Sequence, residues 1–156
     1  MITVTLEAFF RTGMLGPVHL GMSRDQIQKA FGVPDDVGLV SRKYRRPSLW
    51  KYGDLELIFV QGGDELTLIH LDGFQIPQAG GELQLDPWII RGGMTRGLVE
   101  HHLTACSLPF QPIQSPEGYC TWLQVGAGVV LVFIDEERLF SPPTGLYSIS
   151  LSSRRG

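Results

Sequence analysis

One short sequence pattern, present twice, constrains the fold of this chain more than any other feature. Residues 20–34 read LGMSRDQIQKAFGVP, and residues 92–103 read GGMTRGLVEHHL. In the alignment of the two, the Gly-Met-Ser-Arg of residues 21–24 falls on the Gly-Met-Thr-Arg of residues 93–96. The shared residues are those that begin a helix and seat its apolar side, so we expect two short helices of one design.

The first copy predicts a two-turn helix with a start signal and a stop signal. Its apolar residues recur at the spacing of one helical face, at Ile27, Ala30 and Phe31. Ser23 and Gln26 form a capping-box pattern, in which each side chain accepts a hydrogen bond from a backbone N–H group of the first turn. We expect Gly32 to end the helix in the left-handed conformation and Pro34 to prevent its continuation.

The second copy predicts a similar helix with weaker signals. Val99 and Leu103 take the apolar positions, but Leu98 stands where the first copy has glutamine, so the capping box is lost. The stop also differs, because residues 106–110, CSLPF, replace the glycine and proline of the first copy.

Segments with the patterns of β-strands come after the first helix. Residues 50–52 and 55–59 predict a hairpin that turns at Gly53 and Asp54, because apolar and polar residues alternate on both sides of that turn. Residues 65–74 predict one more strand.

The second helix is succeeded by a comparable series. In residues 118–137, the glycine-rich residues 126–128 mark a turn between a strand that contains Cys120 and an apolar strand at residues 129–134. Residues 145–153 predict the last strand. The common unit is therefore a helix followed by a three-stranded antiparallel meander, present twice. We predict an α+β fold in which two tandem repeats, residues 1–76 and 77–156, share one core as a pseudo-symmetric domain.

Two segments outside these units are less regular. Residues 75–87 are rich in glycine and proline and predict a surface crossover between the halves. Residues 3–13 fit either a helix ending at Gly13 or an edge strand; Thr3 as a cap and the nearby leucine and phenylalanines favour the helix.

Composition and charge narrow the classes of function. With 43% hydrophobic and 19% charged residues, the chain is expected to fold as a globular protein. A net charge of −3 gives no general attraction to nucleic acid. The N-terminal sequence lacks an export signal and a lipid-attachment cysteine, and no apolar run reaches the roughly 18 residues of a membrane span. We therefore predict a cytoplasmic protein with no nucleic-acid and no membrane partner.

The first copy, together with the segment after it, resembles a known module. Gly21-Met22-Ser23, then Ile27, Phe31-Gly32-Val33-Pro34 and Trp50-Lys51-Tyr52 before an alternating strand are similar to the SmpA/BamE outer-membrane lipoproteins. A tandem pair of such modules resembles the beta-lactamase inhibitory proteins. The resemblance implies one long, curved antiparallel sheet whose concave face binds a partner protein. Small immunity proteins, which cover the active site of a toxin, use such binding in the cytoplasm.

The sequence offers only weak evidence for a metal site. His102 and Cys106 are four residues apart on the predicted second helix and could share a metal, yet zinc needs about four ligands, and only Cys120, His101 or Glu100 could complete the set. The pattern is more typical of an exposed helix beside a buried cysteine, so we predict no metal and no cofactor.

A catalytic role also has little support in the sequence. Cys106 or Cys120 could act as a nucleophile with a histidine and Asp135, but both cysteines stand where small core residues are expected. The acidic residues 135–137 lack the spacing of a calcium loop, and the glycine pairs lack the order of a phosphate loop. We therefore predict that the protein is not an enzyme.

The remaining candidates for function are aromatic and basic residues. Tryptophan, tyrosine and arginine dominate binding hot spots, although the same aromatic residues could instead fill the core. The candidate partner contacts are Arg42, Lys43, Tyr44, Arg45, Arg46, Trp50, Tyr52 and Trp122. We expect a protein-binding module of the immunity or inhibitor type, monomeric or weakly dimeric, with a toxin domain as one candidate partner. The alternative is a small-molecule- or metal-binding protein with its site between the repeats.

Overall fold

The computed structural model describes residues 2–40, 42–136 and 143–153 of the chain. These residues form an α+β fold, as the sequence predicts. Its helices are α1 (Leu6–Thr12), α2 (Arg24–Phe31) and α3 (Arg96–Ala105). Its strands are β1 (Ile2–Thr5), β2 (Asp36–Val37), β3 (Leu49–Tyr52), β4 (Leu55–Phe59), β5 (Leu66–Asp72), β6 (Leu83–Asp86), β7 (Phe110–Ile113), β8 (Cys120–Val125), β9 (Val129–Ile134) and β10 (Gly145–Ser152).

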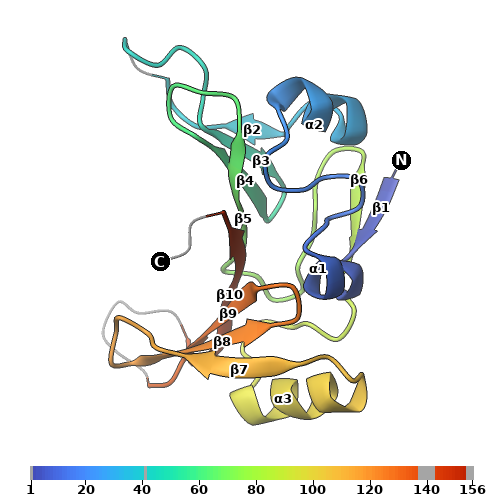
Figure 1. Cartoon of the computed structure of the whole chain (residues 1–156), viewed down its shortest axis with the longest axis vertical. Coiled ribbons are helices and arrows are strands. Elements are labelled where there is room, and N and C mark those ends of the chain that lie inside the picture. Colours follow the sequence, from blue (N-terminus) through green and yellow to red (C-terminus); the bar gives the residue numbers. More distant parts are fainter. Residues whose placement is uncertain (1, 41, 137–142, 154–156) are drawn as a thin grey trace.

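Eight of the strands form one antiparallel sheet that joins the two halves of the chain. Its order is β2-β3-β4-β5-β10-β9-β8-β7, so β5 and β10, the last strand of each half, lie side by side at the centre. The strands change direction markedly from β3 and β4 to β7 and β8, as expected for a twisted sheet (Figure 1). The strands β1 and β6 form a separate parallel pair.

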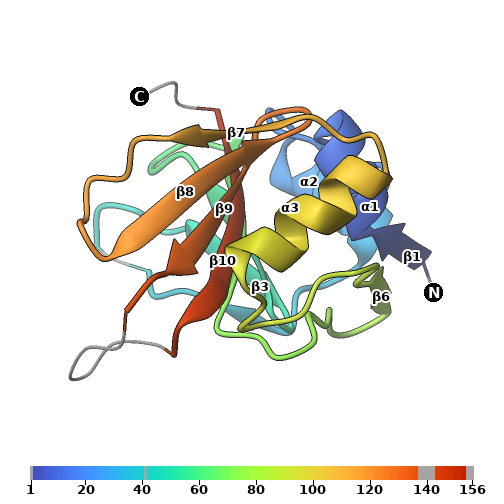
Figure 2. The same ribbon diagram turned by 90° about the horizontal axis from the view of Figure 1, so that it is seen from below.

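The helices and the β1–β6 pair lie together on one side of the sheet (Figure 2). One hydrophobic core fills the space between these layers, and it draws residues from both halves, such as Ile27 and Leu57 from the first and Val99 and Leu131 from the second. Among the described residues, no helix covers the opposite side of the sheet, which we call the uncovered face.

The Gly-Met pair common to both copies has the same backbone role in each half. The N–H group of Gly21 donates to the carbonyl of Leu66, and Leu66 donates to the carbonyl of Met22. In the second half, Gly93 and Met94 make the same pair of bonds with Leu146. The segment before each repeat helix is therefore tied to the start of the last strand of its half.

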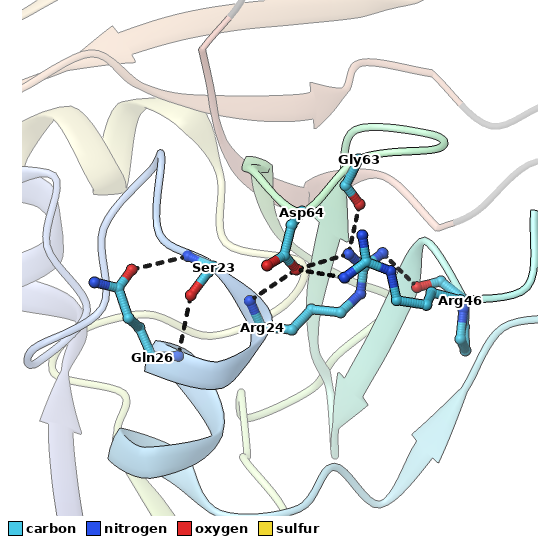
Figure 3. A network of polar contacts seen from close by, with 7 residues as sticks. Ser23, Arg24, Gln26, Arg46, Gly63 and Asp64 are labelled. Carbon is cyan, nitrogen blue, oxygen red and sulfur yellow. Dashed lines mark hydrogen bonds and ion pairs between the residues drawn. The ribbon is translucent and has the colours of Figure 1, made fainter.

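The predicted caps of α2 are present. The Ser23 hydroxyl accepts a hydrogen bond from the backbone N–H of Gln26 at 3.2 Å, and the Gln26 side chain accepts one from the N–H of Ser23 at 3.0 Å (Figure 3). The capping box is confirmed. Gly32 has φ +81° and ψ −170°, so it has the expected positive φ but not the left-handed helical conformation that we predicted.

The end of α3 is different from that of α2. Ser107 takes a left-handed conformation with φ +57°, and the N–H of Leu108 donates to the carbonyl of Leu103 at 2.9 Å. These are features of a Schellman motif, and the side chains of Leu103 and Leu108, at its two ends, are both buried in the core.

The structure contains four strands, β1, β2, β6 and β7, in addition to the two predicted three-stranded meanders. The short β2 and β7 extend each three-stranded meander to four strands, at the two edges of the sheet. The predicted crossover of residues 75–87 contains β6, which pairs with β1. The N-terminal segment contains both alternatives, a strand and then a helix that ends at Gly13, and its N-cap is Thr5 rather than Thr3. Parallel pairing between distant segments leaves no local pattern, so the sequence did not indicate it.

Candidate binding surface

Two of the predicted contact residues, Trp50 and Tyr52, lie in the core, and we correct their assignment. Trp50 is 7% exposed and Tyr52 is 0% exposed. The Tyr52 hydroxyl donates to the carbonyl of Gly32 at 2.8 Å, and burial, with a smaller contribution from the charge of Asp35, raises its pKa to about 12. The Trp50 ring packs edge-on against Phe59. Both side chains lie on the side of the sheet that the helices cover, and they are therefore buried.

The basic segment, residues 42–46, is accessible in the loop between β2 and β3. Its four cationic residues, Arg42, Lys43, Arg45 and Arg46, are exposed, and Tyr44 is half-buried. A Cβ atom placed on Gly62 would lie 2.7 Å from the Tyr44 ring, so this glycine lets the ring approach the β4–β5 hairpin closely. The basic segment is thus held against a neighbouring turn while its cationic side chains face solvent.

A buried arginine anchors the region beneath the basic segment (Figure 3). Arg24, the first residue of α2, is only 7% exposed, and its guanidinium carbon lies 4.3 Å from the centre of the Phe59 ring. Its terminal nitrogens donate to the carbonyls of Gly63 at 2.6 Å and Pro47 at 2.8 Å. The same side chain pairs with the Asp64 carboxylate at 3.0 Å. The helix start is therefore joined to the β4–β5 hairpin and to the loop before β3.

Asp64 is the acidic centre of this network. Its Oδ1 accepts from both the backbone and the side chain of Arg24, and it lies 3.4 Å from a terminal nitrogen of Arg46. Desolvation acts to raise the pKa of Asp64, but the hydrogen bonds from Arg24 and the charges of Arg46 and Arg24 outweigh it and lower that pKa below its usual value. Arg24 and Asp64 were not among the predicted contacts, because no local spacing relates the two.

Trp122 lies on the uncovered face of the sheet. Strand pairing places it directly beside Ile113 of β7 and Val132 of β9, and Val132 in turn beside Ser148 of β10. The neighbouring residues on β8 and β9, such as Leu123 and Leu131, point into the core. The row Ile113–Trp122–Val132 is half-buried, so part of each apolar side chain faces solvent.

A groove of about 1310 Å³ runs over this row and draws its walls from both halves of the chain. Beside the apolar row it is lined by Gln124 and Val130, by three alternate serines of β10 (Ser148, Ser150 and Ser152), and by His70 of β5. The loop after α1 closes one end with Met14, His19 and Leu20. None of the described residues that line the groove is an aspartate, glutamate, lysine or arginine.

The predicted contacts do not form one surface. The loop that carries the basic segment projects at one end of the molecule, whereas β8, which carries Trp122, lies toward the other end (Figure 1). The strand pattern correctly indicated alternation, but it could not indicate which side of each strand the helices would cover.

The residues considered for metal binding and catalysis do not form one site: Glu100, His101, His102 and Cys106 lie on α3 or at its end, whereas Cys120 and Asp135 lie in and after strands of the sheet. Cys106 is half-buried at the end of α3, Cys120 is buried in β8, and no disulfide joins these two described residues. Asp135 accepts a hydrogen bond from the Thr121 hydroxyl at 2.7 Å, while Glu137 lies outside the described residues. Among the residues that the structure describes, no group of three or more His, Cys, Asp or Glu side chains could hold a metal ion. In the same residues, no helix is long and apolar enough to cross a membrane.

Comparison of the chain with models of known families, with curated proteins and with solved structures finds no match.

Proposed function

We propose that this protein is a non-enzymatic protein-binding module, built from two tandem repeats, that binds its partner through the uncovered face of the sheet. The observation that supports this proposal most directly is the groove centred on Trp122. Solvent-accessible apolar side chains gathered on one surface often mark a site of interaction, and tryptophan is prominent among the residues that dominate binding energy.

The repeat origin is supported by the backbone contacts of the two helices. Each Gly-Met pair bonds to the first part of the last strand of its half. In addition, the sulfur of Met22 accepts from the N–H of His19, and the sulfur of Met94 accepts from the N–H of Arg91. The same local geometry therefore occurs at both aligned positions, as duplication of one unit would produce.

Immunity-type or inhibitor-type binding is the form that we propose, with a protein such as a toxin domain as the partner of a monomeric or weakly dimeric chain in the cytoplasm. The groove supplies the apolar centre of the contact. The basic segment, which lies at the other end of the molecule, would supply a separate electrostatic contact with an acidic region of the same partner, and such contacts chiefly accelerate association.

A small-molecule-binding protein is the second candidate, because the groove lies between the halves and mixes hydroxyl, amide and apolar groups. Its volume of about 1310 Å³ is above the roughly 300 to 1,000 Å³ that is usual for small-molecule pockets. The size of the groove therefore favours a macromolecular partner.

Site-specific photocrosslinking in cells of the source organism tests the proposal. A photoreactive phenylalanine analogue at Val132, in the groove, is expected to form an adduct with one partner protein. The matched control carries the same analogue at Leu98, an exposed residue of α3 on the covered side of the sheet. Adducts at position 98 but none at position 132 would show that the uncovered face is not the binding surface.

A further inference from the structure

We infer that the partner fills the groove with an uncharged peptide segment, which packs apolar side chains on Trp122 and Val132 and hydrogen-bonds to the polar groups around them. The inference rests on the proposed protein-binding function. It goes beyond that proposal by naming the chemistry of the contacting segment.

The apolar side of the groove is continuous across three strands. Ile113, Trp122 and Val132 are direct cross-strand neighbours, and Val130 lies one row further along β9. All four are half-buried, so they present a ready-made apolar surface without any rearrangement of the core. An aromatic or aliphatic side chain of the partner would remove this apolar surface from water, which is favourable.

Polar groups of the groove suit the backbone of a peptide. Ser148 and Ser150 occupy alternate positions of β10, next to the apolar row. Ser148 is only 6% exposed, whereas Ser150 is half-buried. Their short side chains keep the centre of the groove open, and the more accessible Ser150 hydroxyl can donate or accept. Gln124 accepts from Gln111 at 3.1 Å through its side-chain oxygen, which leaves its amide N–H groups oriented by that bond. Peptide carbonyl and N–H groups are the uncharged partners that such side chains require.

The distribution of charge favours an uncharged occupant. The described lining contains two histidines, His19 and His70, as its titratable residues. At the edge of the groove, His70 of the lining lies 3.2 Å from Asp72, the cross-strand neighbour of Ser148. Further along the same face Lys51 lies 3.8 Å from Glu56, so these charged groups already have partners. An ionised side chain buried against the Trp122 row would therefore lose its hydration without gaining a counter-charge, which is strongly unfavourable.

A second macromolecular class, nucleic acid, fits the groove poorly. Binding to a phosphate backbone depends on lysine and arginine contacts, and no described residue of the lining is a lysine or an arginine. An acidic peptide would be drawn to the basic segment instead. The groove and the basic segment therefore differ in the occupant that each can accept.

Selection from a phage-displayed library of random peptides tests the inference on the full-length protein. The wild-type chain is expected to enrich peptides with aromatic or aliphatic residues and without Asp, Glu, Lys or Arg in their common core. Val132→Asp is expected to shift the selection toward peptides with Lys or Arg, and Val132→Lys toward peptides with Asp or Glu. Leu98→Asp, on the opposite side of the molecule, is the matched control and is expected to select the wild-type peptides.

The affinity of the protein for a selected peptide gives a quantitative test of the same inference. We expect Val132→Lys to weaken it by on the order of tenfold or more, the usual effect of losing a central apolar contact. Val130→Lys serves as a second groove variant if Val132→Lys fails to fold, which near-ultraviolet circular dichroism would reveal.

Three results would overturn the inference: a wild-type consensus with charged residues in its core, equal binding to the Val132→Lys and Val130→Lys variants and to wild type, or enrichment of no peptide. If any of these occurred while the analogue at Val132 still captured a protein, the chemistry of the contact would be wrong and the protein-binding proposal would stand. If neither the peptide selection nor the photocrosslinking gave its expected result, both the inference and the protein-binding proposal would be wrong.

Discussion

The starts of α2 and α3 have nearly the same sequence, Gly-Met-Ser-Arg and Gly-Met-Thr-Arg, but their arginines have different surroundings. Arg24 is buried and joins the helix to a hairpin and a loop. Arg96 is exposed and pairs only with Glu100, one turn further along α3, at 2.7 Å among the described residues. The comparison shows that a shared helix-start pattern determines the helix but not the tertiary role of its first side chain.

The reason for the difference lies outside the helices. Asp64 stands two residues before Leu66, to which Gly21 and Met22 are bonded; two residues before Leu146, the corresponding partner in the second half, stands Thr144. The second half therefore offers no carboxylate at this point, and Arg96 turns to a residue of its own helix. Exposed pairs of that kind contribute little to stability.

Removing the two arginines gives the largest expected contrast. Arg24→Ala leaves the Gly63 and Pro47 carbonyls without their donor and the Asp64 carboxylate without its main partner, so we expect a loss of about 2–4 kcal/mol in the free energy of unfolding. Arg96→Ala is expected to cost less than about 0.5 kcal/mol. Urea denaturation of both variants measures the difference, and equal losses would contradict the assigned roles.

The ends of the two helices provide the next test. Gly32, with φ +81° and ψ −170°, occupies a region that is essentially open to glycine alone, so Gly32→Ala is expected to destabilise the protein by about 1–3 kcal/mol. Ser107 is a non-glycine residue in the left-handed region, so Ser107→Gly should raise stability by up to about 1 kcal/mol. Thermal unfolding followed by circular dichroism checks both signs. A stabilising Gly32→Ala would show that α2 ends differently.

A smaller effect is expected from the capping box that only α2 possesses among the described helices. Gln26→Ala removes the bond from the Ser23 N–H to the Gln26 side chain, at a cost of about 0.5–1 kcal/mol. Leu98→Ala changes the aligned position of α3, where leucine cannot make such a bond, and is expected to be close to neutral. Guanidinium denaturation of the pair measures the contrast, which would disappear if the box contributed nothing to folding.

The smallest expected effect is a change in the stability of the protein with pH, through the Asp64 carboxylate. Because the folded-state pKa of Asp64 is lowered from 3.8, its carboxylate contributes stability that is fully present above pH 3.8 and is lost as the pH falls through the lower folded-state value. Asp64→Asn should therefore be less stable than wild type above that pH, with the gap narrowing in more acidic solution. Unfolding curves across this range test the sign; a gap that widens toward low pH would refute it.

Local elements were predictable from the sequence because local interactions form them. The Ser23 cap, the turn at Gly53, and the alternation of Leu55, Leu57 and Phe59 were all inferred from short spacings, and each appears in the structure. The edge strands β2 and β7 were missed, since two-residue and proline-containing segments have no strand pattern. The pairing of β1 with β6 was missed because it joins segments about eighty residues apart in sequence.

The candidate site was only partly predictable. Trp122 was identified as a contact residue, and it lies in the groove. Trp50 and Tyr52 were identified by the same reasoning and lie in the core. Alternation places Trp50 and Tyr52 on one side of a strand, but a side becomes a surface only if no helix packs against it.

What the sequence alone determined is therefore the set of local units: capped helices, tight hairpins and strands with one apolar side. The tertiary structure decided how those units were used, by placing β5 beside β10, burying Arg24 against Asp64, and leaving the Trp122 side of the sheet open. The physical reason is the separation along the sequence of the groups that interact. Helix caps and turns depend on atoms a few residues apart, whereas burial depends on which distant segments meet.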